Sequence, residues 1–360
     1  MNRFLCKLCK HSFSVNHKRK LPPLWIAHID GLPFRKIANQ YDLSPIQIYR
    51  QVEKEMNLLP PNEWITGRFC ERFSGILNID GKFIKVRGYE KKIAFIYALD
   101  YLSHDIVAGI LAVGESYEAF LKLFSILKEV SYTPKVVISD ETPALPLALE
   151  RVFPRCFQQL CHTHYLENIR VLLKIRTEEK YRSFFNELSK IFAPNLSLEH
   201  RLFVLSSLEE KYAHDFLVNH IVEDILDKYH LLFQFEKISD CPNSNNIIEA
   251  FNSHLQGRLK TIKGFESFKG AERWLNAWMI RRRTKPFTDC EGRFKILNGK
   301  CSLEETIYEK LKFEDVYEKI TEKLQNIKRK SQKTSTQNDT ELSYFWCSAA
   351  NTFSFIGKNW

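Results

Sequence analysis

The order of the apolar segments between residues 74 and 175 is the feature that most constrains the fold of this chain. Strand-like runs at 76–86, 92–101 and 106–113 follow one another through short turns, a pattern typical of antiparallel hairpins. The segments that follow alternate between helix and strand. Helices are predicted at 116–130, 143–152 and 163–174, with strands between them at 135–139 and 156–161. We therefore expect an α/β fold with an open mixed sheet flanked by helices.

The composition changes on both sides of this segment. Residues 176–240 are poor in strand signals and carry Leu, Phe, Glu and Lys at helical spacing, which predicts an all-helical insertion. The sheet domain, begun at 74–175, is expected to end with 241–285, where a turn leads into a helix. Residues 1–20 are predicted to be a small zinc-ribbon-like knuckle, and residues 21–59 a helical module. Residues 286–360 are predicted to be a basic helical region with a tail.

The chain is basic, with 53 Lys and Arg against 43 Asp and Glu, a net charge of +10 and a pI near 9.0. Such a charge favours an acidic partner, of which nucleic acid is the commonest. Positive charge is concentrated in residues 1–29, which contain no Asp or Glu, and in a second cluster. That cluster, which we expect to contact DNA, comprises Arg258, Lys260, Arg281, Arg282 and Arg283.

The nine cysteines show no regular disulfide spacing, and neither a secretory signal nor a long uncharged apolar segment is visible. We therefore expect a cytoplasmic protein without a membrane anchor, and its basic charge favours association with DNA at the nucleoid. No glycine-rich phosphate-binding loop is apparent, so no nucleotide cofactor is expected.

Three acidic residues stand at places where a charge is costly. Asp80 interrupts the apolar run 76–84, Asp140 closes the run 135–140, and Glu249 lies in a stretch with helical spacing. A carboxylate in or just beyond a buried strand is unfavourable unless it is paired or holds a cation. Two such strands and a third carboxylate on a helix predict a magnesium site made of oxygen ligands.

The order of these residues and the motifs around them resemble the DDE transposases, whose catalytic domain has the ribonuclease H-like fold. The resemblance is to the Mutator-like superfamily and its bacterial insertion-sequence relatives, and it covers roughly residues 74–285. Besides the three acidic residues, it rests on Glu115–Phe120, on the Cys-x-x-His pair of Cys161 and His164, and on Asn245–Asn252, which surrounds Glu249.

The resemblance implies that Asp80, Asp140 and Glu249 are catalytic and bind two magnesium or manganese ions. The implied chemistry is in-line phosphoryl transfer, which cleaves DNA strands and joins them to a target. It further implies that Cys161, His164, Asn245 and Asn252 support the site. The expected partners are double-stranded DNA, as terminal inverted repeats and target, and further copies of the chain in a homodimer or higher oligomer.

Two points near this site stay open at the level of the sequence. Asp100 and Asp105 border the second and third strands and are alternative metal ligands, although we interpret both as turn residues. Cys161 and His164 are spaced like zinc ligands, with His162 as the obvious third and no visible fourth. The alternative is a buried cysteine that is hydrogen-bonded to a histidine.

The N-terminal knuckle contains two candidate zinc ligands, Cys6 and Cys9. The segment around them resembles the second half of a zinc ribbon, and a closed zinc site needs four ligands. Either Cys6 and Cys9 recruit His11 or His17 as a further ligand, or the first Cys pair lies upstream of Met1. A remnant that binds no metal is an equally good interpretation.

Residues 34–55 predict a helix-turn-helix. Ile37, Ala38, Ile48 and Val52 are expected to face its core, with Ser44 as the cap of the second helix and Pro45 at its first position. This arrangement would leave three side chains exposed for the major groove, those of Gln47, Arg50 and Gln51. An ordinary helical hairpin is the alternative.

The favoured function is a transposase that cuts and joins DNA at the ends of its own mobile element. A domesticated transposase that binds specific DNA without catalysis is the main alternative, and an intact acidic triad argues against it. A ribonuclease H-like nuclease that acts on another nucleic acid is disfavoured by the helix-turn-helix and by the helical insertion.

Overall fold

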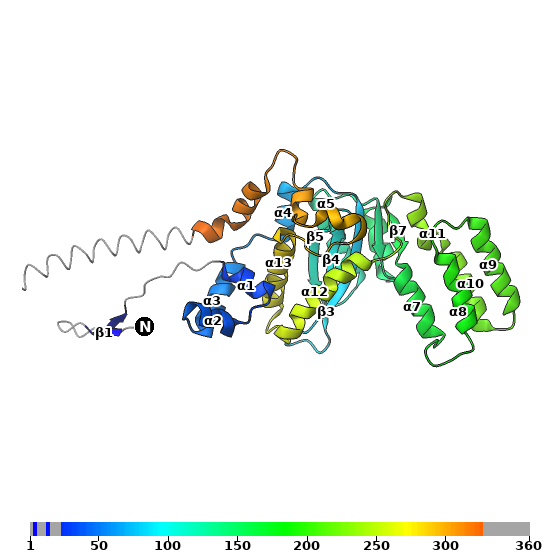
Figure 1. Cartoon of the computed structure of the whole chain (residues 1–360), viewed down its shortest axis with the longest axis horizontal. Helices are drawn as coiled ribbons and strands as arrows, with labels where there is room; N and C mark the ends of the chain where they lie inside the picture. The colour runs from blue at the N-terminus through cyan, green and yellow to red at the C-terminus, as the bar shows by residue number, and fades with distance from the viewer. Residues whose placement is uncertain (1–2, 6–11, 15–22, 327–360) are drawn as a thin grey trace, which may run out of the picture. The chain divides into compact units, whose positions relative to one another are not determined.

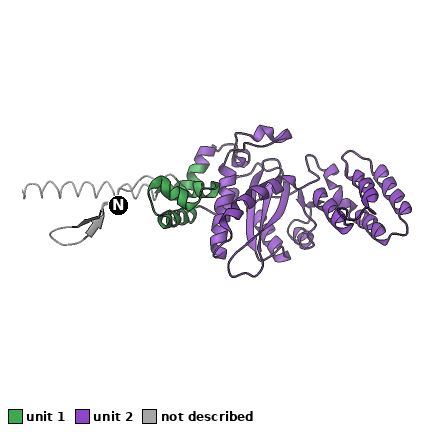
Figure 2. Cartoon of the chain, turned by 60° about the horizontal axis from the view of Figure 1, so that its bottom comes forward, with its two compact units in different colours: residues 1–59, 317–360 green, residues 60–316 purple. Residues whose placement is uncertain are grey.

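The computed structural model describes residues 3–5, 12–14 and 23–326, with side chains from residue 23 onward. The chain divides into two compact units, residues 1–59 with 317–360 and residues 60–316 (Figures 1 and 2). No helix in the described part of the chain is long and apolar enough to cross a membrane. Asp80, Asp140 and Glu249 all belong to the second unit.

The first unit contains a short antiparallel pair, β1 (Arg3–Leu5) and β2 (Ser12–Ser14), and the helices α1 (Leu24–Asp30), α2 (Phe34–Tyr41) and α3 (Pro45–Met56). Ser44 caps α3 in a reciprocal capping box with Gln47, and Asp42 turns the chain in the left-handed region with φ 53°. The four side chains predicted to face the core are buried: Ile37, Ala38, Ile48 and Val52. These local predictions are confirmed, whereas the DNA-binding role of the module stays a prediction.

The second unit is built on a five-stranded mixed sheet. Its strands are β3 (Ile76–Ile84), β4 (Ile93–Asp100), β5 (Asp105–Ala112), β6 (Val136–Ser139) and β7 (Phe157–Leu160), in the order β5-β4-β3-β6-β7. The first three strands pair antiparallel, and β6 and β7 run parallel to β3. This is the mixed sheet that the sequence predicted, in the strand order of the ribonuclease H-like fold.

Helices cover both faces of this sheet (Figure 1). On one face, α5 (Tyr117–Glu129) and α6 (Ala144–Val152) share an apolar core with Leu77 and Ile79 of β3. On the other face lie α12 (Asn246–Ile262) and α13 (Phe268–Thr284), where Trp278 packs edge-on against Tyr97 of β4. Because successive strand residues face opposite sides, Asn78 and Asp80 are directed toward α12.

The outer edge of the sheet is covered by α4 (Asn62–Phe69). Asn62 Nδ2 donates to the carbonyls of Ile106 and Val107, and Thr66 donates its hydroxyl to Val107. These bonds occupy acceptors on β5 that would otherwise leave an open strand edge.

The chain is helical between β7 and α12, and we call this part the insertion. It begins with α7 (His162–Leu172), which the sequence placed in the sheet domain. The segment expected to be the helical insertion, 176–240, contains α8 (Arg182–Ser189), η1 (Lys190–Phe192), α9 (Leu198–Lys211), α10 (Phe216–Asp227), α11 (Tyr229–Leu232) and η2 (Gln234–Lys237). These helices share an apolar core of their own, to which β7 contributes Leu160. Gln159 donates to the carbonyl of Leu232 at 2.7 Å and so ties the end of the insertion to β7.

A buried ion pair joins β5 to α13. Arg283 and Asp105 are both fully buried, and Arg283 Nη2 lies 2.7 Å from Asp105 Oδ2. Ser302 and Thr306 of α14 (Ser302–Thr306) donate hydroxyls to the same carboxylate. Two predictions are therefore wrong: Arg283 is not exposed for DNA, and Asp105 is not an ordinary turn residue but an internal counterion.

The chain beyond α13 continues through η3 (Gly292–Leu297) and α14, and residues 313–326 are helical.

Asp100, at the end of β4, is fully buried and accepts hydrogen bonds from Ser74, Ser103 and Tyr132. Burial raises the pKa of its carboxyl, and these donors hold Asp100 as part of the strand end and not as a free turn residue.

Candidate active site

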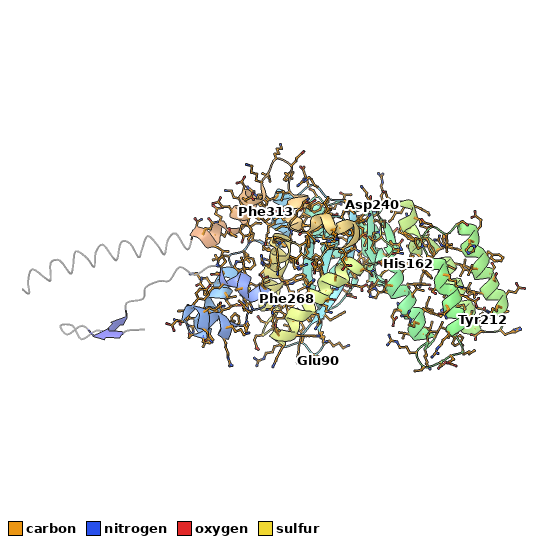
Figure 3. All side chains as sticks on the ribbon, viewed as in Figure 1. Glu90, His162, Tyr212, Asp240, Phe268 and Phe313 are labelled. Atoms are coloured by element: carbon orange, nitrogen blue, oxygen red, sulfur yellow. The ribbon has the colours of Figure 1, made fainter. Side chains whose placement is uncertain are left out.

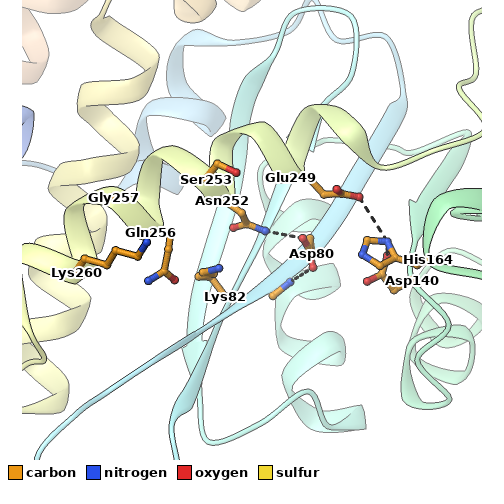
Figure 4. Close-up of a pocket in the computed structure, with 11 residues that line it drawn as sticks. Asp80, Lys82, Asp140, His164, Glu249, Asn252, Ser253, Gln256, Gly257 and Lys260 are labelled. Carbon is orange, nitrogen blue, oxygen red and sulfur yellow. Dashed lines mark hydrogen bonds and ion pairs between the residues drawn. The ribbon is translucent and has the colours of Figure 1, made fainter. Parts of the chain in front are cut away.

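Three carboxylates from distant parts of the chain line one open cavity of about 590 Å³ (Figure 4). Asp80 lies in the middle of β3, Asp140 directly follows β6, and Glu249 lies in the first turn of α12. The parallel register places Asn78 beside Ile138, so that the two aspartates, each two residues further along its strand, come to the same level of the sheet. The structure thus brings together the three acidic residues that the sequence singled out.

Asn245 fixes the start of α12 against β3. Its buried side chain accepts a hydrogen bond from Asn78 Nδ2 at 2.6 Å and donates to the carbonyl of Ile79 at 3.0 Å. Glu249 lies one helical turn further on and is thereby held over the sheet. The predicted supporting role of Asn245 thus has a geometric basis: this side chain sets where Glu249 stands relative to Asp80.

Asn252 contacts Asp80 directly. Its Nδ2 donates to Asp80 Oδ2 at 2.5 Å, and its Oδ1 accepts from the hydroxyl of Tyr97 at 3.1 Å. The tyrosine therefore fixes the orientation of the amide, so that the NH₂ group faces the carboxylate. Tyr97 lies opposite Asp80 on the neighbouring strand, a position that no motif in the sequence indicated.

The electrostatics of the cavity favour a cation. Burial, with Asp140 and Glu115 nearby, raises the pKa of Asp80 to about 7, although the backbone N–H of Gly81 donates to this carboxylate. Burial and Asp140 likewise raise the pKa of Glu115. Clustered carboxylates with raised pKa values are those that gain most from a bound divalent ion.

Glu115 is a fourth acidic residue at this site that was not predicted as a site residue. Its Oε1 lies so close to the backbone of Gly81 that a Cβ at that position would come within 1.9 Å of it. The sequence placed Glu115 in a motif that opens α5, but nothing in that motif indicated that the side chain reaches Asp80.

His164 lies between two of the acidic residues. Its Nδ1 is 2.7 Å from Asp140 Oδ1 and 3.5 Å from Glu249 Oε1, and it is 3.4 Å from Cys161 Sγ. Contact with Asp140 is the main reason that the pKa of His164 is raised to about 11. Cys161 Sγ also accepts the backbone N–H of Asn245. The predicted support residues Cys161 and His164 therefore lie at the acidic cluster itself.

His162 is not a partner of this pair. It is buried, its Nε2 lies 2.6 Å from the carbonyl of Leu232, and its ring packs against Phe192 and Phe233 where the insertion meets the sheet (Figure 3). Burial lowers the pKa of His162 to about 4. The prediction of His162 as a third zinc ligand is wrong, because successive residues at the start of a helix point in different directions.

One face of α12 continues the cavity away from the acidic residues. Along it lie Asn252, Ser253, Gln256 and Lys260, and Lys82 of β3 lines the same cavity. Figure 4 shows the two lysines on the same side of Asp80, away from His164. Lys260 was predicted to contact DNA and is exposed beside the acidic centre, which is where a polyanion bound at this site would pass.

The other basic residues predicted to contact DNA differ in their surroundings. Arg258 Nη1 donates to Thr261, and the guanidinium of Arg282 lies over the ring of Phe251 at 4.5 Å. Arg281 and Arg282 are half-buried. Arg283, as described above, points inward.

The N-terminal predictions are described only in part. Cys6, Cys9, His11 and His17 lie outside the described residues. On α3, Arg50 and Gln47 are exposed, and the Oε1 of Gln47 accepts the backbone N–H of Ser44. Gln51 is half-buried and donates to Glu55, so that its side chain is less open than predicted.

The residues at the cavity fit a hard divalent cation. Asp140 Oδ1 and Glu249 Oε1 are shielded from solvent and face the same ring nitrogen, His164 Nδ1, at 2.7 Å and 3.5 Å. One N–H does not satisfy both oxygens fully, whereas a bound cation would. Asp80, Asp140 and Glu249 are the oxygen donors that magnesium or manganese would use.

Comparison with known proteins places the chain in a family. The fold defines the class, a ribonuclease H-like domain with a helical insertion. The family model described as "Transposase, Mutator family" matches residues 46–284, which is well over half of the chain. The protein therefore belongs to the Mutator family of transposases.

Two solved structures are similar to the chain at low identity. The Drosophila P element transposase strand transfer complex matches with 12% identity and a TM-score of 0.40, over 74% of this chain and 94% of that chain. The simian T-cell lymphotropic virus intasome in complex with PP2A regulatory subunit B56 gamma matches with 12% identity and a TM-score of 0.23, over 51% of this chain and 66% of that chain. No curated protein sequence matches the chain.

Proposed function

We propose that this protein is a DDE transposase that cleaves DNA at the ends of its mobile element and joins the freed ends to a target. Asp80, Asp140 and Glu249 are its catalytic residues. The observation that carries this proposal is their convergence: carboxylates from β3, from the end of β6 and from α12 line the same cavity. Family membership alone would not single out these three among the 43 acidic residues of the chain.

The proposed site would hold two magnesium or manganese ions through these carboxylates. When bound, the ions supply activation of the attacking hydroxyl and stabilisation of the leaving oxygen in an in-line displacement at phosphorus. The protein's own part is to orient the ligands. Asn252 holds Asp80, and Asn245 holds the helix that carries Glu249.

The DNA backbone is proposed to run along α12 past Lys82 and Lys260. Both lysines line the cavity next to the carboxylates, and lysine is a suitable donor for phosphate oxygens. Arg258, Arg281 and Arg282 remain candidates for contacts further along the strand. Arg283 is excluded because it is buried.

Recognition of the element's ends is proposed to belong to residues 21–59. Arg50 is exposed on α3, and Gln47 presents its amide from the first turn of the same helix, so that both suit contacts in a major groove. Residues 1–20 are proposed as a knuckle, with zinc at Cys6 and Cys9 if further ligands complete the set. A homodimer or higher oligomer would hold two DNA ends together.

The experiment uses purified protein and labelled duplex DNA from the regions that flank its own gene. We expect nicking that requires magnesium or manganese and leaves a 3′-hydroxyl. Asp80→Ala and Glu249→Gln should abolish nicking with little change in DNA binding. The matched control is Glu272→Gln, which removes an exposed charge from α13 and should nick normally.

Other outcomes contradict parts of the proposal. Binding without nicking by the unsubstituted protein would favour a DNA-binding protein without catalysis. A loss of binding in Glu249→Gln that is as severe as the loss of nicking would show that Glu249 is not a metal ligand.

A further inference from the structure

We propose that Asp140, Cys161 and His164 form a binding site for a thiophilic divalent metal, and that zinc is the ion that fits it. The site is distinct in its donors from the oxygen-only magnesium site, although the two share Asp140. It combines a thiolate, an imidazole and a carboxylate, all of them donors that zinc prefers in proteins.

The distances among the three donors suit ligands of one metal ion. One oxygen of Asp140, the sulfur of Cys161 and a ring nitrogen of His164 all lie within 4.8 Å of one another. His164 Nδ1 is 3.4 Å from Cys161 Sγ. Zinc bonds of usual length give ligand-to-ligand distances of roughly 3.3–3.7 Å in a tetrahedron. The 2.7 Å contact between Asp140 and His164 would have to open, and the fourth position would stay open to a water molecule.

A purely structural role for His164 would leave part of this arrangement unexplained. One ring nitrogen faces a thiol and two carboxylate oxygens, and a single N–H donates well to one acceptor at a time. Its 2.7 Å contact with Asp140 Oδ1 is an ion pair when His164 is protonated. A metal ion would replace that proton and bind Asp140, Cys161 and His164 together.

The three donors are also held in place by the fold. Cys161 and His164 lie three residues apart at the start of α7, and the buried Cys161 Sγ accepts the backbone N–H of Asn245. Asp140 directly follows β6. Two separate elements thus present their donors to one point, and Asn245 supports Cys161 as an outer-shell residue does in metal sites.

A bound zinc ion would occupy Asp140, one of the three carboxylates proposed for catalysis. Zinc is therefore expected to inhibit magnesium-dependent nicking, and Cys161→Ser should relieve that inhibition. This consequence rests on the proposed function. The binding site itself does not, so it is tested by a measurement that needs no DNA.

The test is a cobalt titration of the metal-free, full-length protein. Cys6→Ser and Cys9→Ser are introduced first, so that the N-terminal pair does not contribute. Cobalt in the proposed site should produce thiolate-to-cobalt charge-transfer absorption in the near ultraviolet and the visible bands of tetrahedral cobalt, and zinc should displace it.

The variants identify the ligands. Cys161→Ser should remove the charge-transfer band, and His164→Gln should weaken cobalt binding by roughly tenfold or more, at least the loss seen for outer-shell changes. Cys156→Ser is the matched control, because this cysteine directly precedes β7, at the opposite end of the strand from Cys161, and is not one of the clustered ligands. Asp80→Ala should keep the band, so a lost catalytic activity cannot be mistaken for a lost zinc site.

Two results would overturn the proposal. One is the absence of a thiolate band in the Cys6→Ser, Cys9→Ser protein while its circular dichroism shows that it is folded. The other is a band that survives Cys161→Ser but disappears in Cys156→Ser or another cysteine variant. If Cys161→Ser does not fold, a band of unchanged affinity in His164→Gln would also overturn it.

Discussion

Asn252 donates its side-chain amide to Asp80 Oδ2 over 2.5 Å and so joins the middle of α12 to the middle of β3. The two residues are far apart in the sequence, and Tyr97 on a third element fixes the amide from behind. Through this chain of contacts, the helix that carries Glu249 also orients Asp80. The positions of two carboxylates that we propose to be catalytic are therefore coupled by a neutral side chain.

This coupling predicts that Asn252→Ala lowers DNA nicking by about 10–100-fold, the range seen when an outer-shell partner of a metal ligand is removed. Tyr97→Phe should produce a smaller loss, because the amide remains but loses its fixed orientation. Single-turnover nicking at saturating magnesium measures both effects. Asn186→Ala, at an exposed asparagine of the insertion, should behave like the unsubstituted protein. Equal nicking by Asn252→Ala and the control would show that the contact does not serve catalysis.

The buried pair of Arg283 and Asp105 predicts a loss of stability rather than a loss of DNA affinity. Arg283→Met leaves the Asp105 carboxylate without its counterion in the interior, and breaking a buried pair in this way costs about 3–5 kcal/mol. Arg281→Met, at the half-buried neighbour, should change the free energy of unfolding by less than about 1 kcal/mol and weaken DNA binding instead. Denaturant unfolding and salt-dependent DNA binding of both variants separate the two roles. A stable Arg283→Met protein that binds DNA poorly would contradict this assignment.

Much of this fold was predictable because its signals are local. Strand runs, short turns and the caps of α3 are set by neighbouring residues, and the three acidic residues stood out because they interrupt or end apolar runs. The sequence also identified Cys161, His164, Asn245 and Asn252 through motifs, although not what each one touches.

The missed features depend on tertiary contacts. Arg283 belongs to a run of three arginines, and only the packing of α13 on β5 decides which of the three points inward. Glu115 reaches Asp80 because α5 begins beside the middle of β3, and His162 turns into the insertion while His164 turns toward Asp140. None of these directions is encoded in a spacing that is visible along the chain.

The raised pKa of Asp80 predicts a pH-dependent effect of Asp80→Asn on the metal-free protein. The folded value of about 7 lies above the ordinary value of 3.8. The protonated carboxyl therefore makes its full contribution to folding stability below the ordinary pKa, and this contribution is lost as the pH rises through about 7. Asp80→Asn should accordingly stabilise the metal-free protein more at about pH 8 than at about pH 5, with a difference of at least about 1 kcal/mol.

Thermal unfolding in the presence of a chelator checks this prediction, and a shift of roughly 2–4 °C corresponds to 1 kcal/mol for a protein of this size. At the higher pH, saturating magnesium should make the unsubstituted protein the more stable of the two, because only the aspartate binds the ion. If Asp80→Asn changes the free energy of unfolding equally at both pH values, the carboxyl of Asp80 titrates with its ordinary pKa.

The contact between Gly81 and Glu115 predicts that a single methyl group at Gly81 disturbs the acidic cluster. A Cβ there would lie 1.9 Å from Glu115 Oε1, so Gly81→Ala must push this carboxylate away from residue 81. The glutamate end is flexible, so we expect a change of less than about 1 kcal/mol in the free energy of unfolding, together with a loss of nicking of about tenfold.

A double-mutant cycle decides whether the loss acts through Glu115. Glu115→Ala should lower nicking by a similar factor, and Gly81→Ala should add little to it, because residues in contact are not additive. Nicking rates of the two single variants and the double variant, each measured in magnesium and in manganese, provide the cycle. If the two losses multiply, the methyl group acts on Asp80 directly, and Glu115 is then only a neighbour of the site.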